Sequence, residues 1–321
     1  MVRAGPQALV QDHGRPGFAH LGVPPSGALD RPALDLANRL VGNPADAAGI
    51  EAVLGGVTLR ASCPCLVAVT GAPVRVRRAG TDVDFGTAVP LSPGDELRVG
   101  TPRSGLRCYL AVSGGIAVPA ELGSRSTDVL SGIGPAPLSD GDELPLGAVP
   151  APLPPRHKST DGASVGSKTR HKSTYGGDGE QGGGGGKGHG ADITLPVVLG
   201  PRDDWFADAA GQLAGAAWTV SPTSNRIGVR LDGTPLRRAT SGRGELPTEP
   251  VVTGAVQVPP NGQPVIFLND HPTTGGYPVV AVVLPDALPL LAQARPGTPL
   301  RLRATERGTE PSLDSRDSGG G

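Results

Sequence analysis

Lysine is scarce in this chain of 321 residues, in which arginine supplies most of the positive charge. The only lysines, Lys158, Lys168, Lys172 and Lys187, all lie within residues 151–191. The remaining chain therefore has no lysine nucleophile or Schiff base, and no Gly-x-x-x-x-Gly-Lys-Ser/Thr loop for phosphate. Phosphate or carboxylate groups must be held by arginine, by backbone N–H groups, or by hydroxyl and amide side chains.

Other signatures are missing as well. No Gly-x-Gly-x-x-Gly follows a strand into a helix, and no Gly-x-Ser-x-Gly elbow occurs. The sole methionine is Met1, so the chain has no Met-Lys-Met biotin acceptor. A net charge of −1 gives no electrostatic reason to bind nucleic acid or an anionic membrane.

Long apolar runs are absent too. None approaches the roughly 20 residues that a membrane helix needs, and the N-terminus lacks the apolar region of a signal peptide. We therefore expect a cytoplasmic protein without a membrane association.

Cysteine is rare, with three residues, and this odd number argues against a secreted disulfide scaffold. Cys63 and Cys65 are two positions apart, which on a strand places both side chains on one face. A metal site would need more ligands, and only Cys108 remains. We predict two buried strand thiols.

Glycine and proline are abundant, with 50 and 35 residues, and most of them separate short apolar runs as turns separate strands. This pattern predicts a mainly β protein with a few short helices. A helix is expected over 30–41, capped by Asp30, a shorter one after Asn43-Pro44, and another over 286–294. Strands are expected at 65–70, 74–77, 96–99, 107–112, 195–199, 255–259, 265–268, 279–284 and 300–304.

One turn sequence recurs. Ser92-Pro-Gly-Asp-Glu-Leu97 returns as Ser139-Asp-Gly-Asp-Glu-Leu144 and more loosely as Arg295-Pro-Gly-Thr-Pro-Leu300. Because the third copy lies near the C-terminus, the two halves of the chain are predicted to share one β design.

Residues 151–191 break the strand pattern. The segment has almost no apolar residues, contains five consecutive glycines, and repeats Arg-His-Lys-Ser-Thr. We predict a disordered insertion there and a disordered tail at 306–321. A metal site at His157, His171 and His189 is the less favoured alternative, because these residues are widely spaced.

The chemically richest stretch is Asn269-Asp-His-Pro-Thr-Thr-Gly-Gly-Tyr-Pro278, between two apolar runs. It is either a hairpin turn whose hydroxyls bond their own backbone or one wall of a binding cleft. Three further polar stretches are candidates for the same cleft, at 11–15, 24–30 and 224–226. The acid–base candidates are Asp12, Glu51, Glu249, Asp270 and His271.

Glu51 stands among small and apolar residues. An acid in such surroundings is either paired or functional, and pairing with an arginine is the favoured interpretation.

Several segments together resemble the biotin-dependent carboxyltransferase family. Within that family, the similarity is to the group of allophanate hydrolase subunit 2, KipA and the C subunit of the bacterial ATP-dependent 5-oxoprolinase. It extends over about 1–150 and 192–305. The matching segments are 10–18 (VQDHGRPGF), 22–30 (GVPPSGALD), 37–44 (ANRLVGNP), 123–128 (GSRSTD), 224–226 (SNR), 254–260 (GAVQVPP) and 270–278 (DHPTTGGYP).

The resemblance implies two cyclophilin-like β-barrel domains, over 1–150 and 192–305. It also implies a hydrolase that opens a cyclic amide. With the A subunit and the KipI-like B subunit of 5-oxoprolinase as partners, such a protein converts 5-oxo-L-proline to L-glutamate at the expense of ATP. ATP would be shared with a partner subunit, and no biotin would be bound to this chain.

Roles for individual residues follow from that hypothesis. Asp12, Glu51 and Asp270 would transfer protons, and no metal is expected. The residues that would bind substrate or phosphate are Gln11, Arg15, Ser26, Asp30, Asn225, Arg226, Gln257, His271, Thr273, Thr274, Gly275, Gly276 and Tyr277.

Two alternatives remain open at this point. One is a regulatory KipA-like protein that binds a KipI-type partner without chemistry of its own. The other is a carboxyltransferase that moves a carboxyl group from biotin to urea. Two features depart from the family pattern: the insertion at 151–191, and His13, which we weigh less than Asp12 or Arg15.

Overall fold

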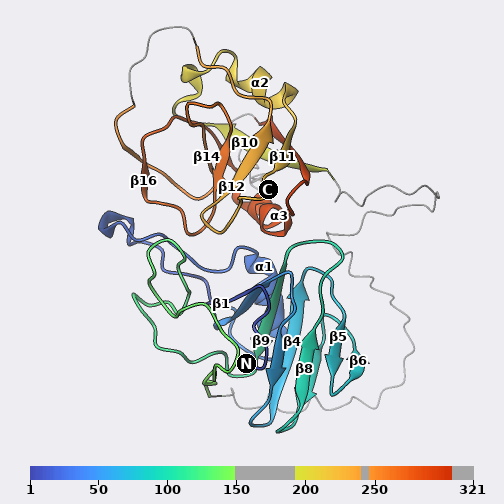
Figure 1. Ribbon diagram of the computed structural model, residues 1–321. Coiled ribbons are helices and arrows are strands. Elements are labelled where there is room, and N and C mark those ends of the chain that lie inside the picture. Colours follow the sequence, from blue (N-terminus) through green and yellow to red (C-terminus); the bar gives the residue numbers. More distant parts are fainter. Residues whose placement is uncertain (149–191, 240–245, 306–321) are drawn as a thin grey trace, which may run out of the picture. The chain divides into compact units, whose positions relative to one another are not determined.

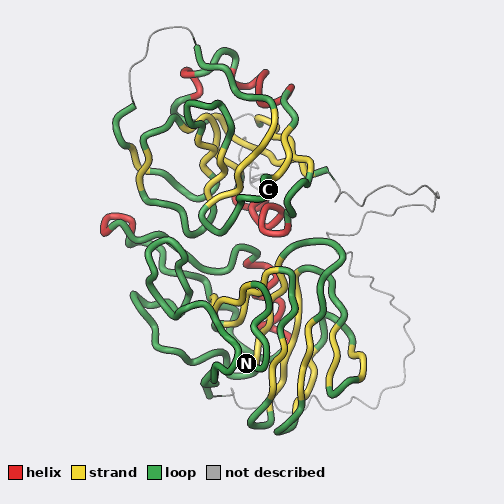
Figure 2. Tube along the Cα trace, in the orientation of Figure 1, coloured by secondary structure: helices red, strands yellow, loops and turns green. Residues whose placement is uncertain are grey.

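The computed structural model describes residues 1–148, 192–239 and 246–305. The predicted insertion and tail, and the three histidines of the insertion, lie outside the described residues. Strands are far more common than helices in Figure 2, and the helices are few and short. The prediction of a mainly β fold is therefore confirmed. No helix among the described residues is long and apolar enough to cross a membrane.

The strands of the first half form two antiparallel sheets (Figure 1). Their side chains meet in an apolar core that includes Val10, Ile50, Val67, Leu97 and Leu110. The five-stranded sheet has the order β1 (Gln7–Gln11), β2 (Gly49–Val53), β9 (Arg107–Val112), β4 (Cys65–Gly71), β7 (Ala88–Leu91). The four-stranded sheet has the order β3 (Thr58–Arg60), β8 (Glu96–Val99), β5 (Val76–Arg78), β6 (Thr81–Val83).

Helix α1 (Arg31–Leu40) packs against β4 and β9. Asp30 caps it as predicted, since its Oδ1 accepts the Ala33 N–H at 3.1 Å. The shorter helix predicted after Asn43-Pro44 does not form. Asn43 instead turns its amide inward, donating to Asn38 Oδ1 at 3.0 Å and to the Val112 carbonyl at 2.8 Å, and fixes a turn.

The strands of the second half close into a seven-stranded barrel. Parallel pairing of the first and last strands, β10 and β18, helps to close it, and Leu195, Trp218 and Ile266 lie in its core. The order is β10 (Ile193–Leu199), β17 (Val279–Val283), β14 (Ala255–Gln257), β15 (Val265–Phe267), β12 (Gly228–Gly233), β11 (Trp218–Val220), β18 (Pro299–Ala304).

Short elements complete this half. A two-stranded sheet pairs β13 (Glu249–Pro250) with β16 (Thr274–Gly275). The helices are α2 (Ala209–Gly215) and α3 (Leu288–Gln293), the latter within the predicted 286–294. Single 3₁₀ turns occur here at Asp203–Trp205 (η2) and Pro285–Ala287 (η3), and in the first half at Ala19–Leu21 (η1).

The recurring turn sequence folds in the same way each time. The Ser92 N–H donates to Asp95 Oδ2 at 2.9 Å, and the Ser139 N–H donates to Asp142 Oδ2 at 2.7 Å. In the third copy the Arg295 N–H donates to Thr298 Oγ1 at 3.2 Å. A polar side chain at the fourth position thus closes the turn in both halves.

The prediction for the cysteine pair is wrong. Cys63 is exposed in the bend before β4, and Cys65, the first residue of that strand, is only partly buried. Pro64 has no N–H to join a β ladder, so the strand begins after it and leaves Cys63 outside.

Candidate functional site

A buried carboxylate on β2 is the centre of the site. Glu51 pairs in register with Leu9 on β1 and with Tyr109 on β9. Its Oε2 accepts the Tyr109 hydroxyl at 2.8 Å and the Leu29 N–H at 3.0 Å. Glu51 is 1% exposed, so its charge requires a partner inside the protein.

That partner comes from the other half of the sequence. Arg226, which is 1% exposed, donates from Nη1 to Glu51 Oε1 at 2.6 Å. It grips Asp270 with two bonds of 2.9 Å, from Nε to Oδ2 and from Nη2 to Oδ1, and Nη2 also reaches the Gly27 carbonyl at 2.7 Å. Arg107 Nε lies 3.3 Å from Glu51 Oε1. The predicted pairing of Glu51 with an arginine is confirmed, and we call Glu51, Arg107, Arg226 and Asp270 the ion cluster.

The carboxylates of the ion cluster differ in their electrostatics. Burial alone would raise the pKa of Glu51, but Arg226, Arg107, the Leu29 N–H and the Tyr109 hydroxyl outweigh it and lower that pKa. At Asp270 burial prevails over the Arg226 charge, and the pKa is raised above its ordinary value. One carboxyl therefore holds its charge while the other accepts a proton more readily, an arrangement typical of acid–base sites.

Asp30 lies next to the ion cluster. Burial raises its pKa, and the Glu51 charge adds to the effect, against hydrogen bonds from Gln293 and Ala33. Gln293 Nε2 donates to Asp30 Oδ2 at 2.8 Å. The sequence does not reveal this contact, because a glutamine at the end of a short amphipathic helix resembles a solvent-facing residue.

A second polar network surrounds Asp12. Its Oδ1 accepts the hydroxyls of Ser124 and Ser126, both at 2.6 Å, and its Oδ2 accepts the Arg125 N–H at 2.6 Å. The Gly14 N–H adds a bond of 2.8 Å to Oδ1. The two serines were not predicted as site residues, although both lie in the 123–128 segment that marked the family resemblance.

Arg15 and Ser26 extend this network. Arg15 donates from Nη1 to Ser26 Oγ at 3.0 Å and from Nη2 to the Ser126 carbonyl at 2.5 Å, while Ser26 Oγ donates to Asp128 Oδ2 at 2.8 Å. The donors of Arg15 and Arg226 are thus directed at acceptors of the protein itself.

Two contacts join this network to the ion cluster. The Val129 N–H donates to Asp270 Oδ2 at 3.1 Å, and the Ser26 N–H donates to the Asn269 carbonyl at 2.9 Å. The structure therefore brings together the predicted stretches 11–15 and 24–30 with Arg226 and the start of 269–278.

Gln11 lies at the end of β1 and is fully buried. Its Nε2 donates to the Thr127 carbonyl at 2.9 Å. Among the described residues, neither its Oε1 nor the neighbouring Thr127 Oγ1 has a hydrogen-bond partner.

The later part of the 269–278 stretch has different partners. Thr274 and Gly275 form β16 and pair with Pro250 and Glu249, while the flanking strands β15 and β17 each pair with β14 and not with each other, so the hairpin-turn interpretation is wrong. Tyr277 is 45% exposed. Thr273 accepts the Val251 N–H through its backbone carbonyl, and Asn225, near Arg226, is exposed and caps its own turn.

Gly275 packs closely against the end of the Gln257 side chain. Gln257 Nε2 donates to the Tyr277 carbonyl at 3.1 Å, and a Cβ at Gly275 would lie 2.4 Å from that nitrogen. We predict that Gly275→Ala lowers the free energy of unfolding by about 1–3 kcal/mol in urea denaturation. The matched control is Gly276→Ala, whose Cβ would meet nothing closer than 3.9 Å. Equal losses in the two variants would contradict the prediction.

His271 is buried beside Asp270 and stacks on Phe267, with ring centroids 5.8 Å apart. Burial lowers the pKa of His271 from 6.5, although the Pro272 carbonyl, 2.7 Å from Nδ1, and the carboxylates of Asp270 and Asp128 oppose it. The unfolded chain therefore takes up a proton near pH 6.5 that the folded chain does not, and stability falls as the pH falls.

We expect His271→Asn to flatten the pH dependence of the unfolding free energy below pH 7. The change in slope is at most about 1.4 kcal/mol per pH unit, the value for one linked proton. Urea denaturation at several pH values between about 5.5 and 7.5 measures it. Parallel profiles for the variant and the natural chain would show that His271 does not contribute.

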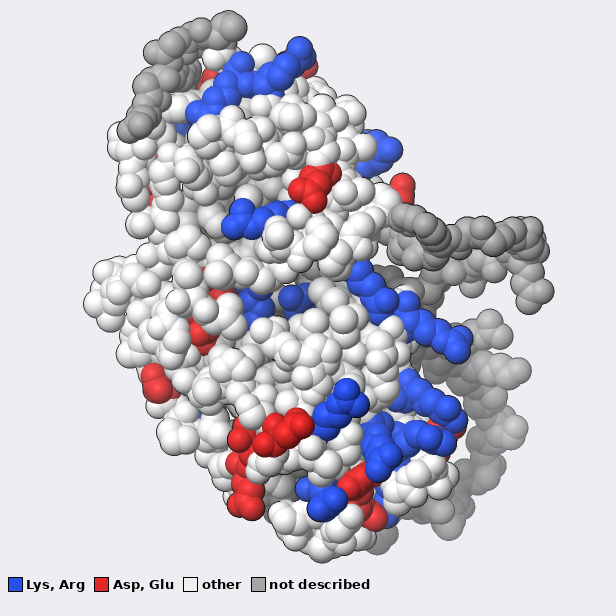
Figure 3. All heavy atoms as spheres, in the orientation of Figure 1, with Lys and Arg blue, Asp and Glu red and all other residues white. Residues whose placement is uncertain are grey.

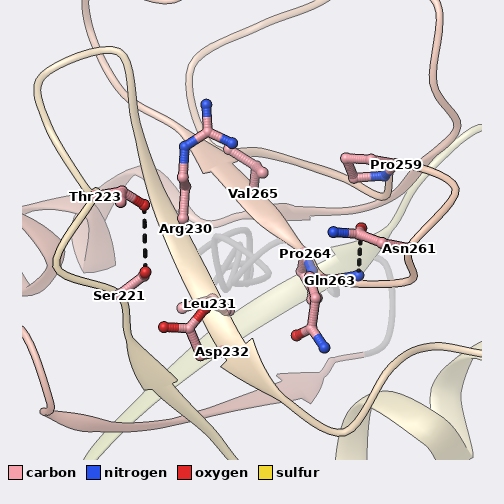
Figure 4. Close-up of a pocket in the computed structure, with 10 residues that line it drawn as sticks. All are labelled: Ser221, Thr223, Arg230, Leu231, Asp232, Pro259, Asn261, Gln263, Pro264 and Val265. Carbon is pink, nitrogen blue, oxygen red and sulfur yellow. Dashed lines mark hydrogen bonds between the residues drawn. The ribbon is translucent and has the colours of Figure 1, made fainter.

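Two cavities on the second half are separate from these residues. Figure 4 shows the smaller one, of about 120 Å³, lined by polar residues such as Arg230, Asp232 and Asn261. The other, of about 560 Å³, lies between α2 and residues 234–237. Neither cavity is lined by a predicted site residue.

Charged groups at the surface are arranged differently from those of the site. Both signs are interspersed on the face drawn in Figure 3. Exposed pairs include Arg75 with Asp82 at 2.6 Å and Arg60 with Glu96 at 2.7 Å. Because such pairs are solvated, they contribute little to stability.

Comparison with known proteins places these motifs in a family context. A family model described as carboxyltransferase domain, subdomain A and B, matches residues 21–304. The C subunit of the Escherichia coli 5-oxoprolinase is 38% identical over 305 residues, which cover 94% of this chain and 89% of that protein.

Solved structures are similar as well. The crystal structure of TTHA0988 matches with 33% identity and a TM-score of 0.74, and the Kluyveromyces lactis urea amidolyase with 30% and 0.78. Both matches cover 94% of this chain. They cover only 54% and 18% of those longer chains, so this chain spans about half of the first and less than a fifth of the second.

Proposed function

The chain belongs to the carboxyltransferase domain family, and we propose that within this family it acts as the C subunit of an ATP-dependent 5-oxoprolinase in the cytoplasm. The observation that carries the proposal is the match over nearly the full length of the corresponding E. coli protein. The urea amidolyase of Saccharomyces cerevisiae is 31% identical, and the match covers only 16% of it.

The chemistry of the ion cluster supports this assignment. Hydrolysis of a cyclic amide adds water across the C–N bond, so the departing nitrogen must gain a proton. Asp270 and Asp30 are buried carboxyl groups with raised pKa values, and both are suited to hold and deliver that proton. Arg226, which binds both Glu51 and Asp270, fixes the geometry of the acidic groups.

The charges of the same residues are relevant to which subunit binds ATP. In the ion cluster and the network around Asp12, the buried carboxylates outnumber the buried guanidinium groups, and the donors of Arg15 and Arg226 are directed at protein acceptors. A triphosphate needs unoccupied cationic or N–H donors. We therefore assign most of the ATP contacts to the KipI-like partner and the cyclic amide to this chain.

Reconstitution tests the proposal. The chain is co-purified with the KipI-like B subunit, the A subunit is added, and ATP hydrolysis and glutamate formation are measured with and without 5-oxo-L-proline. We expect hydrolysis that depends on 5-oxo-L-proline only in the complete mixture. An absence of stimulation with all three proteins present would overturn the proposal.

A carboxyltransferase is the second candidate, favoured by the TM-score of 0.78 with the K. lactis urea amidolyase. It requires a biotin carrier on another chain, since this chain has no Met-Lys-Met acceptor. Transfer of label from carboxybiotin to urea by the purified chain would establish it.

A further inference from the structure

Gln293, the last residue of α3, uses all of its hydrogen-bonding capacity on the first half of the chain. Its Oε1 accepts the N–H groups of Leu106 at 2.9 Å and of Arg107 at 3.0 Å. Its Nε2 donates to Asp30 Oδ2 at 2.8 Å and to the Arg107 carbonyl at 3.1 Å. An amide side chain has two acceptor and two donor sites, so none is left over.

Both residues that Gln293 contacts, Asp30 and Arg107, are connected to Glu51. The Asp30 N–H donates to the Tyr109 hydroxyl at 2.8 Å, and that hydroxyl donates to Glu51 Oε2 at 2.8 Å. Arg107 reaches Glu51 Oε1 from the other side at 3.3 Å. Gln293 therefore contacts both Asp30 and Arg107, and each of these two residues is connected to the Glu51 carboxylate.

Neighbouring residues hold the Gln293 contact in place. Arg107 Nη1 donates to the Ala292 carbonyl at 2.5 Å, and Arg295 donates to the carbonyls of Gly105 and Pro102. Rotation of the amide would leave the N–H groups of Leu106 and Arg107 without an acceptor in a buried setting, which is unfavourable.

We propose that Gln293 is a positioning residue for the ion cluster, whose amide holds Asp30 and Arg107 in the places from which they reach Glu51. The effect of Gln293 on catalysis rests on the proposed function. Gln293 itself transfers no proton, since an amide does not titrate. Gln293 instead keeps titratable groups aligned. Misplacement of such groups by about 1 Å lowers reaction rates by up to about 100-fold.

A charged replacement gives a test on the chain alone. In Gln293→Glu the new carboxyl faces Asp30, and the other ionisable groups nearby are Arg107, Tyr109, Glu51 and Arg295. Two carboxylates at hydrogen-bond distance share one proton, which raises the folded-state pKa of the pair. The variant is therefore nearest to the natural chain in stability at low pH and is destabilised as the pH rises through that pKa.

We expect the melting temperature of Gln293→Glu to fall by roughly 5 °C relative to the natural chain between about pH 5 and pH 8. Gln293→Met, which removes the hydrogen bonds without adding a charge, is the matched control and is expected to show a weaker pH dependence, because only the lowering of the Asp30 pKa by the Gln293 hydrogen bond is lost. A Gln293→Glu profile parallel to that of the natural chain would overturn the inference.

The reconstituted assembly provides the second readout. We expect Gln293→Met to lower kcat for 5-oxo-L-proline by about 10- to 100-fold with little change in KM, because substrate binding is retained and alignment is lost. An unchanged kcat, or a change in KM alone, would contradict a positioning role. If the natural assembly is inactive, the proposed function fails, and the pH profiles of the two variants still decide the inference.

Discussion

Replacement of Arg226 by alanine is expected to lower the free energy of unfolding by about 3–5 kcal/mol. The guanidinium binds Glu51 and Asp270, both buried, and its removal leaves two carboxyl groups without their main counter-charge. These groups must then remain ionised in a dry environment or take up protons, and both states are unfavourable at neutral pH. Urea denaturation followed by circular dichroism measures the loss.

A neighbouring arginine serves as the control. Arg230 lies on β12 and is exposed, and Arg230→Ala is expected to change the unfolding free energy by no more than about 0.5 kcal/mol. The double variant Asp270→Asn, Arg226→Met removes one buried charge of each sign and leaves Arg107 opposite Glu51, so it is expected to recover part of the loss. A single Arg226→Ala variant as stable as Arg230→Ala would show that the ion cluster does not stabilise the fold.

The large loss also affects how the function is tested. The inactivity of an Arg226→Ala variant would report on folding as much as on catalysis. A conservative replacement at a carboxyl group with a raised pKa is therefore the more informative experiment.

Asp270→Asn is expected to lower the turnover of the reconstituted 5-oxoprolinase by about 100- to 10,000-fold, the range for removal of a general acid or base. Asparagine keeps the size of the side chain and one acceptor for Arg226, but it does not exchange protons at neutral pH. The measurement is the rate of 5-oxo-L-proline-dependent ATP hydrolysis with the two partner proteins in excess.

Asp35→Asn is the matched control, because it removes a carboxylate from α1 that is only paired with His13, at 2.7 Å, near the surface. Its turnover is expected to equal that of the natural chain. Co-purification with the KipI-like partner measures folding and assembly in both variants. An Asp270→Asn assembly with full turnover would show that Asp270 does not transfer a proton in the reaction.

The composition of the candidate site is more predictable than its arrangement. Asp12, Arg15, Ser26, Glu51, Arg226 and Asp270 are all identified from their types and surroundings, and the structure places them in two connected networks. Ser124, Ser126, Asp128 and Gln293 are missed. Serine, aspartate and glutamine are common in turns and on surfaces, so their residue type alone gives no signal of burial.

Local chemistry explains which elements are predicted correctly. Asp30 caps a helix with an apolar stripe, and the recurring turn is closed by a side chain three residues later, so both depend on neighbours in sequence. The exposed Cys63 and the missing helix after Asn43 depend on where a strand begins and on a bond to Val112. Such distant partners are not visible in a local pattern.

The two ends of the 269–278 stretch show the same difference between local sequence patterns and distant tertiary contacts. The sequence by itself determined a mainly β protein, its capped helix, its turns and its membership of a family. Only the tertiary structure decided that Asp270 belongs to the ion cluster while Thr274 and Gly275 pair with β13. The physical reason is distance in sequence: Glu51 on β2 and Arg226 before β12 are 175 positions apart, and only the tertiary fold brings their side chains within 2.6 Å.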